Sequence, residues 1–397
     1  MQRICSLALL LFFALPPAAL AQSALLVVDD DGGPGVDFTE LQAAVDAAPA
    51  KSVLLVRAGT YAAFSIAAQS VSVIADAGAQ PRVLGAPTIT DLAVGQSVLL
   101  QGLRFAPAAA GSAAGTIANC AGWIGLEDCD LEAPASGAST LRIEDALQVF
   151  VARTTITGPA PGPTSAALHV LDSQVHLYDA LLFGGSAVGS APGGDALLLE
   201  QTQGASAFAF ASGCSFQGGV GAPGQPQPCS AGSEGGAGVR LLGTAPALTR
   251  LDSPTLGGAG GADAGCGGGA DGPALIGAGA LVDLPGCALS FVVDSPVSSG
   301  GIAINAFEGP PTALVFLLIA TAPSAQHLPV FSGTFTCAAP FFTFFVGVVP
   351  PSGTLLVPVP VTLNPSVEAF SFYEQSAFLL PGGAIQLSAP SYPVVVQ

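Results

Sequence analysis

Positive charge is the scarcest feature of this sequence. Nine Lys and Arg residues, with Lys51 as the single lysine, face 27 acidic residues, which gives a formal net charge of −18. Such a surface repels nucleic acid and anionic membranes, so we expect no nucleic-acid partner. It also disfavours polyanionic sugars unless calcium bridges protein and sugar, and calcium is therefore the one cofactor left open. The simpler interpretation is that acidic residues keep an apolar exported protein in solution.

Long apolar runs are missing beyond the N-terminus. Residues 1–21 predict a secretory signal peptide, because Arg3 gives a positive start, residues 7–15 are apolar and small residues end at Ala21. This stretch is too short to span a bilayer, and residues 312–322 fit a buried strand better. We therefore expect an exported protein, secreted or held at the cell surface, without a transmembrane segment.

Cysteines are few, and their number becomes odd when the signal peptide is removed. Without Cys5, seven of the eight remain, so at least one thiol stays unpaired in an oxidising compartment. Cys229 and Cys266 occupy equivalent places in successive repeats, at a spacing that suits a disulfide. A second bond is expected between Cys287 and Cys337. The pairing of Cys120, Cys129 and Cys214 stays open. One alternative is a bond between Cys120 and Cys129, which would leave Cys214 as a buried thiol.

A short pattern recurs through the middle of the chain. An apolar residue, four variable residues and another apolar residue return in steps of 26, 25, 26, 34 and 40 residues. The copies are residues 100–105, 126–131, 151–156, 177–182, 211–216 and 251–256. A recurring period of this size indicates stacked units with one continuous core, and short segments between Gly, Pro and Ser indicate strands. A second strand precedes the copies, as a parallel β-helix requires. Gly-rich inserts at residues 218–238 and 257–272 are expected to project as loops on one side.

The N-terminal part resembles a known family. Residues 38–49 (FTELQAAVDAAP) and residues 53–61 (VLLVRAGTY) are similar to the entry of pectinesterase-like and pectate-lyase-like proteins. This resemblance implies a right-handed parallel β-helix with a helix over its first coil. Residues 40–48 fit that helix, and Thr39 with Gln42 fits a capping box. The family's catalytic motifs are not matched.

These observations predict an all-β protein. After the signal peptide we expect an N-terminal strand and capping helix at residues 22–52. A single-stranded, pectin lyase-like, right-handed parallel β-helix is expected at residues 53–288. From residue 289 to 397 strands alternate with Pro-Gly turns, which predicts a C-terminal antiparallel β-sandwich.

One column of the predicted helix carries polar chemistry. Equivalent positions of successive coils stack about 4.8 Å apart, which brings Asp128, Arg153 and Asp179 into one column. Pectinesterase-like enzymes place paired Asp residues and an Arg on adjacent coils, so the resemblance makes these three the candidate catalytic residues. Two carboxylates beside a guanidinium could serve as acid and base or nucleophile. Glu127 and Tyr178 flank the column as candidate binding residues. The same column is expected to hold Gly102, Gly213 and Ser253.

A structural interpretation of this column competes with the catalytic one. A ladder of Asp and Arg on an open surface offsets its own charges and contributes about 0–1 kcal/mol per pair. A catalytic ladder should lie in a groove flanked by loops and aromatic residues. A structural ladder should lie on a flat, open face.

Other polar groups give weaker signals. His169 and His176 lack the further ligands that a metal needs, and we expect ordinary solvated histidines; His327 has no evident partner. The acidic residues of the loop at 29–37 lack the spacing of an EF-hand and fit a solvated turn better than a calcium site: Asp29, Asp30, Asp31 and Asp37. No metal site is predicted.

The function expected first is therefore non-catalytic. Missing catalytic motifs, sparse charge and a separate C-terminal module favour an extracellular scaffold that binds a glycan or a cell-surface protein. The alternative is a polysaccharide-active enzyme of the pectate lyase or pectinesterase type.

Overall fold

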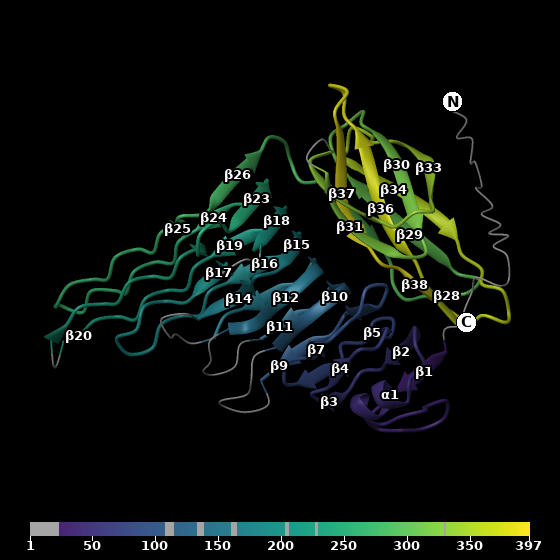
Figure 1. Cartoon of the computed structure of the whole chain (residues 1–397), viewed down its shortest axis with the longest axis horizontal. Coiled ribbons are helices and arrows are strands. Elements are labelled where there is room, and N and C mark those ends of the chain that lie inside the picture. The colour runs from purple at the N-terminus through teal and green to yellow at the C-terminus, as the bar shows by residue number, and fades with distance from the viewer. Residues whose placement is uncertain are drawn as a thin grey trace.

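The computed structural model describes residues 24–107, 115–132, 139–159, 165–202, 206–226, 229–328 and 331–397. The predicted signal peptide lies outside these ranges. Within them the regular secondary structure is almost entirely β, with a long array of parallel strands followed by smaller, mainly antiparallel sheets (Figure 1). No helix in the described ranges has the length and apolarity that crossing a membrane requires.

The parallel array has three faces, which the chain visits in a fixed order. Face 1 contains β1 (Leu25–Val28), β2 (Ser52–Val56), β5 (Val71–Ala75), β8 (Ser97–Gln101), the second halves of β10 (Gly115–Glu127) and β12 (Ser139–Ala152), β15 (Gln174–Tyr178), β18 (Phe208–Ser212), β23 (Ala247–Leu251) and β26 (Ala280–Leu284). Face 2 contains β3 (Thr60–Ala62), β6 (Arg82–Leu84), β9 (Arg104–Ala106), β11 (Asp130–Leu131), β13 (Thr155–Thr157), β16 (Leu181–Phe183), β19 (Ser215–Gln217) and β24 (Thr255–Leu256). Face 3 contains β4 (Ser65–Ala67), β7 (Thr88–Thr90), the first halves of β10 and β12, β14 (Ala166–Leu171), β17 (Asp195–Glu200), β22 (Val239–Leu242) and β25 (Leu275–Gly277).

All strand pairs between successive turns of the array are parallel, which is compatible with a parallel β-helix. The predicted repeats align as expected across four steps: Leu100 pairs with Leu126, Leu126 with Val151, and Val151 with Leu177, which pairs with Ala211. Side chains that point inward from the three faces form one continuous apolar core. The last step differs by one residue from the prediction, because Ala211 pairs with Arg250 rather than Leu251.

A short helix covers the first turn of the array. Helix α1 (Leu41–Ala47) buries Leu41, Ala44 and Val45 in the apolar core at the purple end of Figure 1. The predicted capping box is wrong, because Glu40 is the N-cap residue and no side chain caps the helix. Instead, the Gln42 amide oxygen accepts the backbone N–H of Ser65 at 2.7 Å, which ties the helix to β4.

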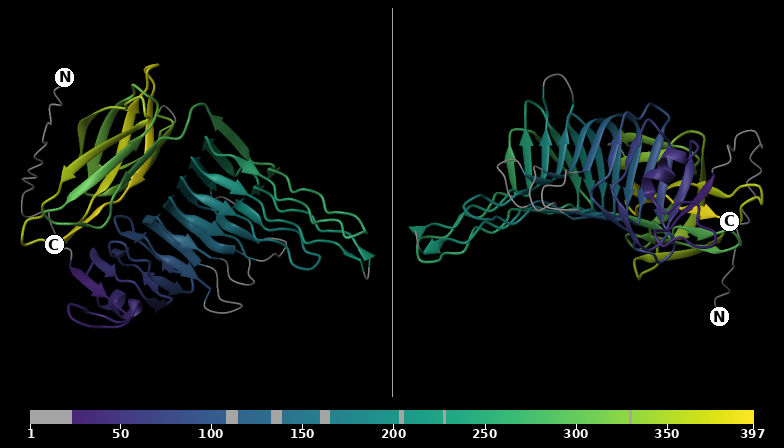
Figure 2. Two further views of the ribbon diagram at one scale, coloured as in Figure 1. Left: turned by 180° about the vertical axis from the view of Figure 1, so that it is seen from behind. Right: turned by 90° about the horizontal axis from the view of Figure 1, so that it is seen from below.

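The Gly-rich inserts project to one side, as predicted, but they are not irregular loops. They run side by side as a thin bundle that leaves the array (Figure 2). Gly218, Gly221 and Gly224 donate hydrogen bonds to the carbonyls of residues 256, 259 and 262, and Gly232, Gly235 and Gly238 to those of 267, 270 and 273. This lateral bonding repeats every three residues, the period of a polyproline II helix, whereas side chains in a β-strand repeat every two.

Only glycine fits the contacts inside this bundle. A Cβ atom on Gly219 would lie 1.9 Å from the carbonyl oxygen of Gly185, and one on Gly258 would lie 1.9 Å from that of Gly219. Near the tip, β20 (Gln225–Pro226) and β21 (Cys229–Ser230) pair, and the predicted disulfide Cys229–Cys266 is present with a Cα–Cα distance of 5.6 Å. The bundle is therefore an ordered, disulfide-closed element.

The C-terminal part consists of four small sheets. They contain β27 (Ser290–Val293), β29 (Ile302–Glu308) and β34 (Thr354–Pro360); β33 (Phe341–Val348), β30 (Leu314–Ala320), β36 (Tyr373–Leu379) and β37 (Ile385–Ser391); β28 (Val297–Ser298), β38 (Val394–Val396) and β35 (Ala369–Ser371); and β31 (Pro323–Leu328) with β32 (Gly333–Cys337). All pairs are antiparallel except β28 with β38. The expected disulfide between Cys287 and Cys337 is wrong, because the Cys287 thiol is free and exposed and the Cys337 thiol is free and buried in β32. Cys120, Cys129 and Cys214 are also free and buried.

The C-terminal sheets fold back onto face 1 of the array. Outward-pointing aromatic side chains of face 1, including Trp123, Phe150 and Tyr178, form a second apolar cluster with Tyr373 and Tyr392. The Trp123 ring lies 4.8 Å from that of Tyr392, centroid to centroid, in an edge-on arrangement. Where these side chains lie, the outer side of face 1 is thus an internal surface of the protein, whereas Val282 on the last strand, β26, is 48% exposed.

Candidate functional site

The candidate catalytic column lies at the corner where face 1 ends. Asp128, Arg153 and Asp179 follow one another there, each with its backbone in the left-handed region, at φ values of 53°, 47° and 49°. Gly102 and Gly213 have the same conformation, as does Asp252, which occupies the place predicted for Ser253. Asp and Gly tolerate this conformation, whereas for the bulky Arg153 it is uncommon and needs support from contacts.

Arg153 receives that support from both parts of the protein. Its Nε donates to Asp128 Oδ1 at 3.0 Å, and its Nη2 pairs with Glu127. Its Nη1 donates to the carbonyl oxygens of Phe291 and Pro390 in the C-terminal sheets, at 3.5 and 3.4 Å. With 13% of the side chain exposed, the guanidinium is largely enclosed.

Glu127 is the most enclosed charge of this region. Its side chain is fully buried, and it accepts hydrogen bonds from Gln101 Nε2 at 2.7 Å, Ser391 Oγ at 3.0 Å and the backbone N–H of Tyr392 at 3.3 Å. Burial raises the pKa of Glu127, and the Arg153 charge opposes that rise. The pair therefore joins face 1 to the last strands of the chain.

Asp179 stands apart from this pair. Its Oδ2 accepts a hydrogen bond from Ser290 Oγ at 3.4 Å, so it too contacts the start of the C-terminal sheets. Burial raises the pKa of Asp179 to about 6, against the lowering effect of Arg153. A carboxyl group with such a pKa could exchange protons near neutral pH, but its immediate surroundings are protein groups.

Tyr178 also faces the C-terminal sheets. Its hydroxyl lies 3.4 Å from the carbonyl oxygen of Thr334 and 3.3 Å from the Thr334 backbone nitrogen, and burial raises its pKa. The side chain is 1% exposed, so it is enclosed in this structure like Glu127. The two residues predicted to bind a ligand thus bind the protein's own C-terminal part.

His169 and His176 are buried, which corrects the expectation of solvated side chains, and His327 is half-buried. His176 stacks on Phe150 at a centroid distance of 4.8 Å, and its Nδ1 lies 2.9 Å from Thr334 Oγ1. Burial lowers the pKa of His176 to about 3. His327 approaches the same Thr334 hydroxyl at 3.5 Å, while His169 Nε2 lies 2.9 Å from a Glu200 carboxylate oxygen on face 3.

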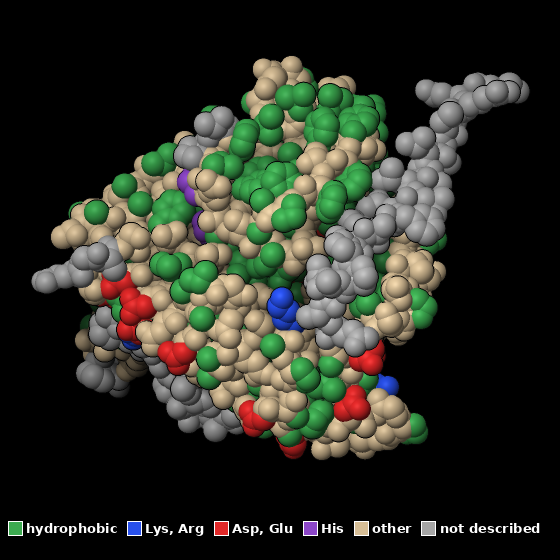
Figure 3. Space-filling model, turned by 45° about the vertical axis from the view of Figure 1, so that its right-hand side comes forward, with side chains coloured by type: hydrophobic (Ala, Val, Ile, Leu, Met, Phe, Trp, Pro, Cys, Tyr) green, Lys and Arg blue, Asp and Glu red, His purple; other side chains and the backbone are tan. Residues whose placement is uncertain are grey.

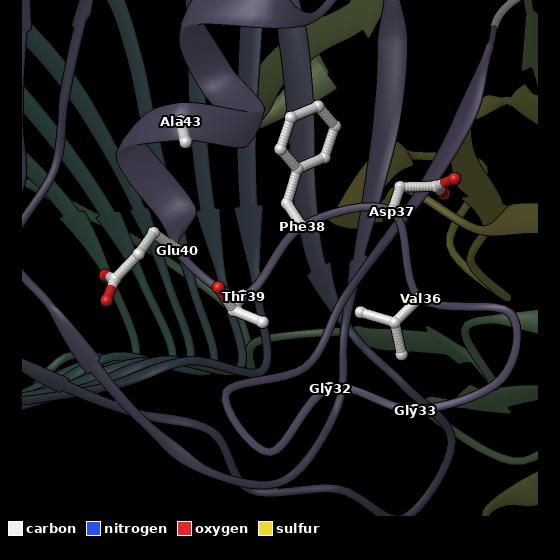
Figure 4. A pocket seen from close by; sticks show the side chains of 8 residues that line it. All are labelled: Gly32, Gly33, Val36, Asp37, Phe38, Thr39, Glu40 and Ala43. Atoms are coloured by element: carbon white, nitrogen blue, oxygen red, sulfur yellow. The ribbon is translucent and has the colours of Figure 1, made fainter.

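The acidic loop near the N-terminus is largely occupied by protein donors. Asp29 pairs with Arg57 at 3.2 Å, and Asp30 accepts the backbone N–H of Thr60 at 2.8 Å. Oxygen atoms of Asp29, Asp30 and Asp31 lie within 4.8 Å of one another. Beside them a pocket lies between the loop and α1; Figure 4 shows Phe38 and Val36 on its walls, with the Glu40 carboxylate directed outward.

The contacts of this region join the parallel array to the C-terminal sheets. Glu127, Arg153 and Asp179 each contact residues that are more than a hundred positions later in the sequence. Among the described residues, Arg153 and Asp179 therefore face protein groups rather than an open groove, whereas Asp128 is half exposed. No sequence pattern pointed to Ser391 or Thr334 as partners, although the apolar runs in face 1 strands, such as residues 53–56, are typical of strands covered on both sides.

Comparisons with known proteins add no functional information. No protein-family model matches the chain, and no curated protein matches it. Among solved structures, the chain is similar to the crystal structure of the PmoD soluble domain from Methylocystis sp. ATCC 49242 (Rockwell). The sequence identity is 14%, the match covers 28% of this chain and 94% of that chain, and the TM-score is 0.19. A likeness at this score carries no argument about function.

Proposed function

We propose that this protein is an exported, non-catalytic scaffold whose parallel array is a right-handed β-helix and which binds a cell-surface protein or glycan. One observation carries the proposal. Of the candidate catalytic residues, Arg153 and Asp179 are bonded to the C-terminal sheets, as is the flanking Glu127, whereas Asp128 is half exposed. A polysaccharide chain would have to displace these sheets to reach Arg153.

The distribution of aromatic residues favours a protein partner over a glycan. All four Tyr and the single Trp are buried, so none offers a ring on which a sugar could stack. Hydrophobic side chains instead gather on the outside of the C-terminal sheets, in the upper part of Figure 3. They include Leu356 at 61% and Phe345 at 59% exposure, and large exposed apolar areas are typical of interaction sites.

An activity assay separates the scaffold from the enzyme. Purified protein is incubated with polygalacturonate, methylated pectin and alginate in the presence of calcium, and both unsaturated products and released methanol are measured. We expect neither, at any enzyme concentration. Product that disappears in Arg153→Ala but persists in Arg104→Ala, which removes an exposed Arg paired with Asp130 and Glu132, would overturn the proposal.

A binding assay then distinguishes the two partner classes. The same polysaccharides are cast into native gels, and the migration of the protein is compared with its migration in plain gels. We expect equal migration in both. Retardation by one of these polysaccharides would keep the scaffold but assign it a glycan partner.

A further inference from the structure

A small pocket lies where three C-terminal sheets meet. It has a volume of about 80 Å³, and its walls come from β27, β29, β30, β34 and β38. Apolar side chains form nearly all of it, among them Val293, Ala303, Val359 and Phe372. Such a lining is typical of sites that take apolar groups.

One buried amide interrupts this apolar lining. Asn305 follows Ala303 on the inward side of β29, is 4% exposed and lines the pocket. Its backbone pairs with Val293 and Val357, but no hydrogen bond joins its side-chain amide to another described residue. Its amide atoms are not sealed from solvent, so the amide can form a hydrogen bond with a molecule that enters the pocket.

The walls and the amide together define the ligand. An amide both donates and accepts hydrogen bonds, so it can bind a hydroxyl or a carbonyl group. The volume is about half that of a 150 Å³ apolar cavity known to hold benzene, which limits the ligand to about three or four non-hydrogen atoms. We propose that the pocket binds a small branched aliphatic molecule that carries one hydroxyl or carbonyl group at Asn305. This site is independent of the partner proposed above.

Nuclear magnetic resonance tests the site directly. The sequence contains three Asn residues, so the side-chain amide signal of Asn305 can be assigned from its disappearance in Asn305→Leu. The labelled protein is titrated with propan-2-ol. We expect the Asn305 amide signals to shift saturably, together with signals from Ala303 and Val359.

Three variants decide the interpretation. Ala303→Leu fills the pocket and should abolish the saturable shifts, whereas Ile304→Ala, on the outward side of the same strand, should leave them unchanged. Asn305→Leu keeps the volume and should weaken binding about tenfold, because one hydrogen bond is lost. If Ala303→Leu fails to fold, Asn305→Leu alone decides. Shifts that do not saturate, or unchanged affinity in Asn305→Leu, would overturn the proposal and assign the amide to a bound water.

Discussion

Replacing Arg153 by Ala is expected to weaken the contact between the array and the C-terminal sheets. The substitution leaves the fully buried Glu127 carboxylate without its cation, while Asp128, half exposed, can turn to water. Removing one partner of a buried ion pair costs about 3–5 kcal/mol. Because Glu127 keeps hydrogen bonds from Gln101, Ser391 and Tyr392, we expect a loss near the lower limit of that range.

The single Trp provides the assay for this change. Trp123 lies against Tyr373 and Tyr392, so its fluorescence reports when the C-terminal sheets separate from face 1. Urea unfolding followed by this signal should show a lower free energy of unfolding for Arg153→Ala than for the unaltered protein. Arg104→Ala is the matched control, since Arg104 is half exposed and its surface pair contributes about 0–1 kcal/mol.

The pH dependence makes the test specific. The pKa of Glu127 is already raised above its ordinary 4.5 by burial, and removing Arg153 raises it further. The folded state then binds a proton that the unfolded chain has lost, so stability falls as the pH rises above 4.5. The loss caused by Arg153→Ala should therefore be larger at pH 7 than at pH 4.5. A loss equal to that of Arg104→Ala, or one independent of pH, would refute this reasoning.

Three further predictions concern other parts of the molecule. Gly219→Ala should lower hydrogen-exchange protection throughout the Gly-rich bundle, because its Cβ would lie 1.9 Å from the Gly185 carbonyl oxygen; Gly382→Ala, which meets no atom within 4 Å, should leave protection unchanged. In the unfolded chain His176 becomes protonated below its ordinary pKa of 6.5, whereas burial keeps its pKa at about 3 in the folded protein. Its contribution to the free energy of unfolding is therefore present above pH 6.5 and lost on acidification. His176→Phe should remove about 2 kcal/mol of the stability loss between pH 7 and 5, as measured by urea unfolding, and an unchanged pH dependence would contradict this. Of the described cysteines, Cys287 alone should react with a thiol reagent in the native protein, and five should react after unfolding without reductant; more than one native reaction would contradict the structure.

The spacing of the repeats was sufficient to predict the parallel array, but not its last register. The segment around residue 250 permits two alignments that differ by one residue. The prediction assumed that Leu251 points into the core, as apolar residues do on a strand with one solvated side. Leu251 instead pairs with Ser212 in the outward column and is buried there, because face 1 is covered on its outer side as well.

The same missing information limited the interpretation of the candidate column. Its composition was predictable, because strand pairing fixes which residues follow one another at a corner. Its surroundings were not, since Ser391 and Pro390 reach Glu127 and Arg153 through contacts that no local sequence pattern specifies. The period of three in the Gly-rich inserts was present in the sequence, but the glycine runs were interpreted as loops because they follow no strand–turn–helix context.

The covering of face 1 has a consequence for the order in which the protein folds. The array is complete once the chain has reached residue 284, yet the residues that seal its outer side come last, in β37 and β38. Partners in this contact are up to 343 positions apart, as between Leu25 and Glu368. Such distant pairings form slowly, because the entropy cost of closing a long loop comes before the contacts stabilise the folded chain. A strip containing Trp123 and Phe150 therefore stays open to water, and to neighbouring chains, until the chain has been made as far as β38.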